Sequence, residues 1–153
     1  MKSSLFRCKS CGAFNNMQDG HPGNPICGRC KSALDLSGTP QDVDAAGLGR
    51  AVEAATVPVL VDFWAPWCGP CRIASPIVDQ VARARAGRLI ALKVDTEQHA
   101  SVASLYSIQG IPTFILFSNG KVLDRRSGVI PREAFSDWID STFEYNQRKR
   151  DLP

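Results

Sequence analysis

The hydrophobic pattern of residues 41–143 alternates between short continuous apolar runs and longer segments in which apolar residues recur every three or four positions. Continuous runs rich in β-branched residues are typical of buried strands, and the longer spacing is typical of amphipathic helices. The runs predict strands at 57–64, 89–95 and 114–117, and a more charged run predicts an edge strand at 122–126. The periodic segments predict helices at 44–55, 70–86, 97–106 and 131–143.

Local signals define several boundaries of these elements. Asp42 or Asp44 can cap the first helix, because a carboxylate accepts hydrogen bonds from the N–H groups of a first turn. Pro76 lies inside the second helix and should kink it. Asn119-Gly120 predicts a tight hairpin turn. After the first helix the order is strand, helix, strand, helix, strand, strand, helix. This order predicts an α/β fold whose central mixed sheet is parallel first and antiparallel after the hairpin.

The first 36 residues are of a different kind, being polar and rich in turn-forming residues. They hold too few apolar side chains to build a core of their own. Leu34 to Leu36 predicts one short strand at the end of this module. Residues 37–43 are expected to form a linker and 44–143 the main domain, followed by a polar tail at 144–153 that should be disordered from Gln147 onward.

Composition narrows the class of protein. Of the 153 residues, 44% are hydrophobic and 22% are charged, which is typical of a globular protein. No apolar run reaches the length of a membrane span, and the first residues lack the apolar core of a signal peptide, so the expected location is the cytoplasm. The net charge of +3 lies within residues 1–40, which hold five basic and two acidic residues. Because this excess is small, we expect no nucleic-acid partner. The lack of an apolar span predicts no membrane partner, and we expect a monomer.

The six cysteines form three Cys-x-x-Cys pairs, of which the first two lie in the N-terminal module. Cys8 and Cys11 are separated by fifteen residues from Cys27 and Cys30, a spacing typical of a zinc site. Four thiolates saturate a tetrahedral Zn²⁺ ion, so one structural zinc is expected. Two disulfides, or four free redox thiols, are the alternatives.

Two further features of the module bear on this zinc site. Gly12 and Gly28 lie at or within the two cysteine turns and would permit a positive φ near the metal. His21 lies between the two pairs and could in principle be a ligand. Since four sulfurs already complete the tetrahedron, His21 is expected to face solvent.

The third pair, Cys68 and Cys71, follows the apolar run at 57–64 and opens the second helix. A cysteine at a helix N-terminus is stabilised as the thiolate by unpaired N–H groups and the helix dipole. Its partner one turn further on lies on the same face, so the two sulfurs can form a reversible disulfide. Pro70 suits the first turn, where its missing N–H costs nothing. Half of a zinc site, or a structural disulfide, is the alternative.

Asp62 is an anomaly within the strand that leads to this pair. It shares a strand face with Leu60 and Trp64, so its carboxylate should be buried, and burial raises the pKa of a carboxyl group. Asp62 could accept a proton from Cys71, or it could be a structural acid paired with a lysine. Lys93, inside the next predicted strand, is the obvious partner if the two strands are neighbours. Position alone leaves both roles open.

The stretch Trp67-Cys68-Gly69-Pro70-Cys71 resembles the active-site motif of the thioredoxin family. The resemblance covers about two thirds of the chain and implies a thioredoxin fold. It also implies that Asp62 assists Cys71, with Lys93 beside it. The four N-terminal cysteines make the chain similar to the zinc-containing branch of that family in bacteria.

The same resemblance implies a substrate-binding surface. Trp67, Gly69 and Pro70 would border the cysteine pair, and Pro112 would face it through a cis peptide bond after Ile111. Gly128 and Val129 would line the groove on the far side. Clients would dock against this surface through the backbone of Ile111.

The implied activity is reduction of disulfides in client proteins. Cys68 would attack, Cys71 would resolve the mixed disulfide, and thioredoxin reductase with NADPH would restore the dithiol. Two other classes remain open from the sequence. One is a zinc-regulated redox sensor or chaperone, in which oxidation releases the metal. The other is a nucleic-acid-binding zinc ribbon, which the small basic excess and the single aromatic residue between the cysteine pairs, Phe14, disfavour.

Overall fold

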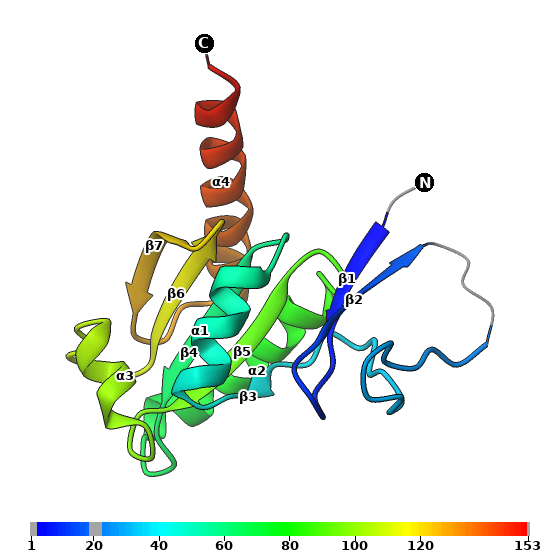
Figure 1. Cartoon of the computed structure of the whole chain (residues 1–153). Helices are drawn as coiled ribbons and strands as arrows, with labels where there is room; N and C mark the ends of the chain where they lie inside the picture. Colours follow the sequence, from blue (N-terminus) through cyan, green and yellow to red (C-terminus); the bar gives the residue numbers. More distant parts are fainter. Residues whose placement is uncertain (1–2, 19–22, 153) are drawn as a thin grey trace.

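The strands form two sheets, one in the N-terminal module and one in the main domain (Figure 1). The structure is a computed structural model that describes residues 3–18 and 23–152, so the expectation for His21 lies outside the described residues. Strands β1 (Ser3–Arg7) and β2 (Phe14–Gln18) form an antiparallel pair. The main sheet has the order β3-β5-β4-β6-β7. Its strands are β3 (Gln41–Asp42), β4 (Val59–Trp64), β5 (Ile90–Asp95), β6 (Thr113–Ser118) and β7 (Lys121–Ser127).

The predicted mixed sheet is confirmed. Strands β3, β5 and β4 run parallel, and β6 and β7 are antiparallel to their neighbours. The hairpin between β6 and β7 turns at Asn119-Gly120, where both residues have positive φ (52° and 78°). These angles suit the tight turn that the Asn-Gly pair predicts. Strand β3 was not predicted, because two polar residues that pair with β5 carry no hydrophobic pattern.

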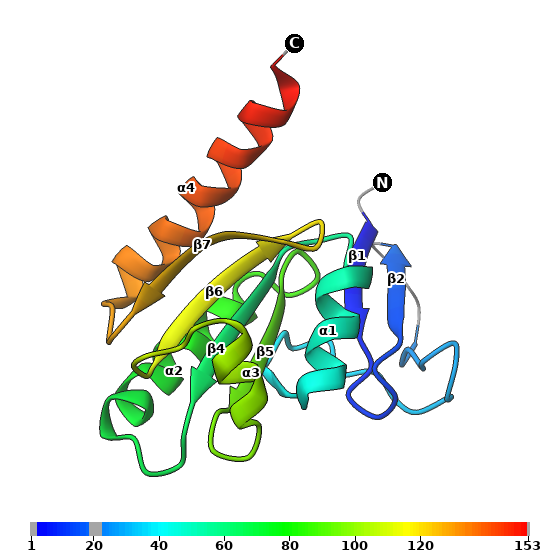
Figure 2. The same cartoon turned by 60° about the vertical axis from the view of Figure 1, so that its left-hand side comes forward.

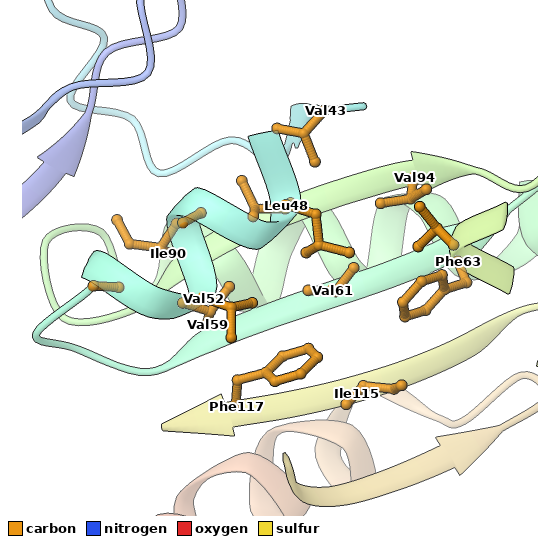
Figure 3. Close-up of a cluster of buried hydrophobic side chains, with 14 of the residues drawn as sticks. Val43, Leu48, Val52, Val59, Val61, Phe63, Ile90, Val94, Ile115 and Phe117 are labelled. Atoms are coloured by element: carbon orange, nitrogen blue, oxygen red, sulfur yellow. The ribbon is translucent and has the colours of Figure 1, made fainter. Parts of the chain in front are cut away.

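Helices α1 (Ala45–Ala54) and α3 (Ala100–Leu105) cover one face of the main sheet, and α2 (Gly69–Arg83) and α4 (Arg132–Asp151) cover the other (Figures 1 and 2). Alternate residues of β4 point to opposite faces. Val59, Val61 and Phe63 belong to the apolar cluster on the α1 and α3 face, and Figure 3 shows Val59 and Val61 next to α1 and Phe63 next to Val94. Leu60 packs with α2 and α4 on the other face. Asp62 lies on the Leu60 face, because side chains alternate along a strand.

The start of helix α1 follows its predicted capping signal. The Asp44 carboxylate accepts a hydrogen bond of 2.7 Å from the Gly47 N–H group, which identifies Asp44 as the cap of α1. Pro76 lies inside α2, as predicted. Helix α3 is shorter than the predicted 97–106 segment, because Asp95 accepts hydrogen bonds from the backbone N–H groups of Glu97 and Gln98 and holds a turn there.

The prediction of a disordered tail from Gln147 is wrong. Helix α4 continues to Asp151 and projects beyond the sheet in both views (Figures 1 and 2). The segment contains no helix breaker before Pro153, and three basic residues occupy its last turn. Basic side chains at a helix C-terminus interact favourably with the helix dipole, so the polar composition supports a helix here.

The N-terminal module packs against the main domain. Leu5 of β1 is 4% exposed and belongs to the same apolar cluster as α1. Its N–H group donates a 2.9 Å hydrogen bond to the Gly87 carbonyl. The Arg7 guanidinium donates to Gln41 Oε1 (2.7 Å), and the Gln41 amide returns a bond to the Arg7 carbonyl (2.9 Å). The module therefore shares the core of the main domain through Leu5.

Two smaller expectations for the module are also wrong. Leu34 to Leu36 forms no strand, and the pairing in this region is a single bridge between Ile26 and Ala33. Gly12 has a positive φ (80°) as expected, but at the second cysteine turn the residue with positive φ is Lys31 (67°) and not Gly28. The boundaries of the 37–43 linker stay a prediction, although β3 lies within that segment.

Within the described ranges 3–18 and 23–152, no helix has the length and apolar character needed to span a membrane.

Candidate functional site

The third cysteine pair lies where β4 ends and α2 begins. Cys68 and Cys71 form a disulfide with their Cα atoms 5.3 Å apart. Cys68 is the N-cap of α2, and its Sγ accepts a hydrogen bond of 3.2 Å from the Cys71 N–H group. Both residues are nearly buried, at 2% and 5% exposed. The predicted placement at a helix N-terminus, where the thiolate is stabilised, is therefore confirmed.

The segment before β6 faces Cys68. The peptide bond between Ile111 and Pro112 is cis. Cys68 Sγ lies 3.8 Å from the Ile111 carbonyl oxygen. The Pro112 carbonyl in turn accepts a 2.9 Å hydrogen bond from the N–H group of Gly128, which has a φ of 89°. Because glycine adopts this conformation without steric cost, Gly128 suits this position.

Exposed apolar side chains stand around the disulfide. Trp67 is 66% exposed, Val129 is 42% exposed and Ile111 is half-buried. Ile73, in the first turns of α2, is 62% exposed, whereas Ala74 and Val78, apolar residues of the same helix, are buried. Helical periodicity assigns a residue to an apolar stripe but cannot tell a stripe's buried centre from its margin. Gly69 and Pro70 are exposed between the two cysteines.

Asp62 is buried behind the disulfide. It is 3% exposed, and its Oδ1 atom has no hydrogen-bond partner among the described residues. Burial raises the pKa of the Asp62 carboxyl to about 7, against the opposing effect of the Lys93 ammonium. Asp62 and Lys93 are partners in the register of β4 and β5, as the sequence suggested.

A cavity of about 270 Å³ connects Asp62 with the disulfide. Its lining includes Asp62, Cys71, Lys93 and Arg72. The Arg72 guanidinium donates a 2.9 Å hydrogen bond to the Pro66 carbonyl. The cavity is large enough to hold water between Asp62 and Cys71.

Trp64 is a site residue that the sequence reasoning did not select. Lys93 Nζ lies 4.7 Å from the centre of the Trp64 ring, a cation–π arrangement. The indole also packs against the buried cluster of Ala65, Cys68 and Cys71, and it lines the same cavity as Cys71. The sequence did contain one indication of this role. Trp64 lies two residues after Asp62, so both side chains point to the same face of the strand.

The four N-terminal cysteines converge on one point. Their Sγ atoms all lie within 4.8 Å of one another. The Sγ atoms of Cys8 and Cys30 are 3.6 Å apart, and those of Cys11 and Cys27 are 3.7 Å apart. The backbone N–H groups of Cys30 and Arg29 donate hydrogen bonds to Cys27, which lower the pKa of its thiol to about 6. This cluster could hold a metal ion.

The two cysteine turns have the same backbone design. In the first, the Gly12 N–H group donates to the Cys8 carbonyl (2.8 Å). In the second, the Lys31 N–H group donates to the Cys27 carbonyl (3.0 Å). Each donor is four residues after the first cysteine of its pair and has positive φ. The turns therefore present two sulfurs each to a common centre.

The sequence and the structure of this chain are similar to those of known thioredoxins. The sequence model of thioredoxin matches residues 41–141. Thioredoxin 1 of Synechococcus elongatus is 42% identical over 91 residues, which cover 60% of this chain and 85% of that protein. The thioredoxin of Synechocystis sp. is 38% identical over 105 residues, which cover 69% of this chain and 97% of that protein. The crystal structure of chloroplastic thioredoxin z matches with a TM-score of 0.64 at 25% identity, covering 69% and 96% of the two chains.

The family match confirms the expected fold and class of activity. It begins at Gln41, so it includes every strand of the main sheet and the whole disulfide site, and it leaves the four-cysteine module outside. A cysteine pair that forms a disulfide at the start of a helix is the redox centre that such a protein needs. The chain therefore belongs to the thioredoxin family of thiol–disulfide oxidoreductases.

Proposed function

We propose that this protein reduces disulfide bonds in client proteins. The Cys68 thiolate attacks one sulfur of the client disulfide and forms a mixed disulfide, while the other client sulfur leaves as a thiolate. The Cys71 thiolate then attacks Cys68 Sγ, which releases the client as a dithiol and leaves the Cys68–Cys71 disulfide. The observation that carries this proposal is that disulfide, formed at the N-terminus of α2 and facing Ile111.

The positions of the two sulfurs support their separate roles. Cys68 caps the helix and faces Ile111 on the docking side, which suits the attacking thiolate. Cys71 lies deeper in the helix and lines the cavity that contains Asp62. A carboxylate with a pKa near 7 can take the Cys71 proton at neutral pH and can return it later. Lys93 keeps the pKa of Asp62 from rising further.

The exposed residues beside the disulfide support a docking surface. Trp67, Val129 and the half-buried Ile111 supply apolar area, whereas Pro112 is buried next to Ile111. Gly69, Pro70 and Gly128 leave room for a client backbone close to Cys68. Solvent-exposed aromatic and aliphatic residues gathered around a reactive centre are typical of a protein-binding site. An extended client segment can pair with the backbone of Ile111 there.

We further propose that Cys8, Cys11, Cys27 and Cys30 hold one structural Zn²⁺ ion, as in the zinc-containing thioredoxins of bacteria. A tetrahedral site with Zn–S bonds of about 2.3 Å has its sulfurs about 3.8 Å apart, and the separations of 3.6 and 3.7 Å fit this geometry. When bound, the metal would join the two cysteine turns. Because four sulfurs leave no open position, it would take no part in the redox reaction.

NADPH-dependent thioredoxin reductase is the proposed electron donor, since the reaction leaves a disulfide that must be reduced again. A reducing compartment such as the cytoplasm suits this cycle and keeps the remaining thiols free for a metal.

The experiment is a coupled assay with the zinc-loaded protein, a bacterial thioredoxin reductase, NADPH and a disulfide-bonded protein substrate. Substrate-dependent NADPH oxidation that disappears in Cys68→Ser would support the proposal. Its absence with folded protein would contradict reductase activity through this electron donor.

A zinc-regulated redox sensor is a second candidate, favoured by one observation. Cys30 is exposed, unlike buried Cys8, whose sulfur is 3.6 Å away, so an oxidant can reach the cluster. Zinc release at mild peroxide concentrations, measured with a chromogenic chelator, would support this function. Retention of the metal while Cys68 and Cys71 become oxidised would contradict it.

A further inference from the structure

Asn15 connects the two cysteine turns of the N-terminal module. It is the second residue of β2, and its side chain is half-buried. Its Oδ1 atom accepts a 2.9 Å hydrogen bond from the N–H group of Gly28, which lies between the two cysteines of the second turn. Its Nδ2 atom donates to the carbonyl of Ala13, which follows the first turn (3.3 Å), and to Cys27 Sγ (3.6 Å). One side chain therefore joins both turns and contacts one of the four sulfurs.

The surrounding groups determine which way the Asn15 amide points. The Gly28 N–H group can only donate, so it must face the side-chain oxygen of Asn15. The amide nitrogen then points to the Ala13 carbonyl and to Cys27 Sγ, and both of these atoms can accept. The opposite orientation would place two donors against each other at Gly28. The N–H···S contact with Cys27 therefore follows from the other two hydrogen bonds.

Cys27 is the ligand that most needs such a donor. It is fully buried, so water does not reach its sulfur. A buried charged group is costly unless hydrogen bonds compensate it. The backbone N–H group of Arg29, within the second turn, donates to Cys27 Sγ over 3.4 Å. Asn15 adds a side-chain donor from a strand outside that turn.

A divalent metal held by four thiolates forms a site of net charge −2. Donors that point at the sulfurs spread this charge, and they also keep each sulfur in its position. Residues that orient metal ligands in this way commonly change metal affinity by about 10- to 100-fold when they are replaced. The contacts of Asn15 are of this kind.

We propose that Asn15 is a positioning residue of the metal site. Its amide N–H group donates to the Cys27 thiolate, and its oxygen holds the second cysteine turn against β2. The proposal rests on the zinc site proposed above and adds to it a residue that does not bind the metal. In this role Asn15 raises the affinity of the four cysteines for the ion.

Asn15→Asp separates the two contacts. Aspartate has nearly the same shape, and its carboxylate can still accept the hydrogen bond from the Gly28 N–H group. It cannot donate to Cys27, and it brings a negative charge next to a thiolate. A residue that only ties β2 to the second turn would tolerate this substitution, whereas a donor to the sulfur would not.

Asn16→Asp is the matched control. Asn16 is the next residue of β2, its side chain is exposed, and it points to the opposite face of the strand from Asn15. Both variants change the net charge equally, so the difference between them reports on the contact with Cys27. Strand β2 lies on the side of β1 away from α1 (Figure 2), and the side-chain partners of Asn15 all belong to the module. We therefore expect both variants to keep the disulfide reductase activity.

The first measurement is the zinc affinity of the full-length, reduced protein, obtained by competition with a chromogenic chelator. We expect Asn15→Asp to bind zinc at least about tenfold more weakly than the unchanged protein. The affinity of Asn16→Asp should stay within about threefold, because an exposed charge is screened by solvent.

The second measurement uses Co²⁺ in place of Zn²⁺, because cobalt thiolates absorb light. A thiolate that loses an N–H···S hydrogen bond becomes richer in electrons. The thiolate-to-cobalt charge-transfer band should therefore move to longer wavelength in Asn15→Asp and keep its position in Asn16→Asp. A merely structural role of Asn15 would leave the band of the cobalt-loaded protein where it is.

Unchanged zinc affinity in Asn15→Asp would overturn the proposal. An equal loss of affinity in both aspartate variants would also overturn it, because the added charge alone would then explain the loss. Weaker binding without a shift of the cobalt band would show that Asn15 does not donate to the sulfur, which again overturns it. Binding of one zinc ion by the unchanged protein would show that the zinc site stands whatever Asn15 does. Absence of zinc binding there would contradict the zinc site and the proposal together.

Discussion

Asp62 and Lys93 are direct neighbours on the parallel strands β4 and β5, yet the Lys93 ammonium lies over the Trp64 ring, 4.7 Å from its centre. Asp62 Oδ1 remains buried without a hydrogen-bond partner in the described chain. Burial therefore outweighs the attraction of Lys93, and the pKa of the Asp62 carboxyl rises to about 7. A buried carboxyl group with this pKa gains and loses its proton near neutral pH, which is the pH range in which the Cys71 thiol must lose its own proton.

The first prediction concerns stability. Since the pKa of Asp62 is raised in the folded protein, the folded state binds the proton that the unfolded state releases above about pH 4. Stability is therefore lost as the pH rises from about 4 to about 7, by at most about 4 kcal/mol. Asp62→Asn should remove this loss.

Urea unfolding of the oxidised protein at a series of pH values measures this effect. The free energy of unfolding of Asp62→Asn should exceed that of the unchanged protein by an amount that grows up to pH 7 and is constant above it. A difference that does not depend on pH would show that the pKa of Asp62 is the same in the folded and the unfolded protein.

The second prediction concerns the resolving step. If Asp62 accepts the Cys71 proton, Asp62→Asn should slow release of a client from its mixed disulfide at least tenfold at pH 7. Lys93→Met is the matched test, because losing the ammonium should raise the pKa of Asp62 and move the pH profile of the same step upward. Stopped-flow tryptophan fluorescence measures the step. An unchanged profile in both variants would assign Asp62 a structural role.

The third prediction separates the two sulfurs. Cys68→Ser should abolish turnover, because it removes the attacking thiolate. Cys71→Ser should form a stable mixed disulfide with a client, because the resolving thiol is absent. Mass spectrometry of the intact protein after incubation with a disulfide-bonded substrate detects that adduct. Trapping by Cys68→Ser and not by Cys71→Ser would reverse the assigned roles.

The sequence predicted those elements whose own residues form a recognisable pattern. Strands β4 and β5 are continuous β-branched runs, and the Cys68 motif combines a redox pair with a helix start. Strands β1 and β2 were not predicted, because their largely polar sequences contain no continuous apolar run, and β3 was not predicted because its pairing partner β5 is distant in sequence. Leu5 is buried only because β1 docks beside Gly87. The cation–π contact of Lys93 likewise depends on two strands meeting, which a pattern along one chain does not reveal.

The fourth prediction tests the design of the cysteine turns. Gly12→Ala places a side chain at a φ of 80°, with its Cβ 3.1 Å from the Arg7 guanidinium. It should destabilise the metal-bound turn by about 1–2 kcal/mol. Gly28→Ala is the control, since Gly28 lacks a positive φ and its Cβ would lie 3.6 Å from Asn15. Competition with a chelator measures the zinc affinity. Equal affinities of the two variants would contradict the prediction.

The last prediction concerns the contact between the module and the main domain. Gly87 has a φ of 85°, and a Cβ there would lie 2.6 Å from the Ser4 Cβ of β1. Such an approach is too close for two carbon atoms, so Gly87→Ala should push β1 away and break the hydrogen bond from the Leu5 N–H group to the Gly87 carbonyl. Leu5 would then leave the core that it shares with α1.

Hydrogen exchange at the Leu5 amide measures this undocking. In Gly87→Ala the exchange should be at least tenfold faster, while the zinc content stays at one ion per chain, since Gly87 is not part of the cysteine cluster. Gly49→Ala is the control, because Gly49 lies in α1 with open space around it and alanine favours a helix. Unchanged exchange in Gly87→Ala would show that β1 can shift without leaving the domain. Loss of zinc together with faster exchange would show that docking on the main domain holds the cysteine turns in place.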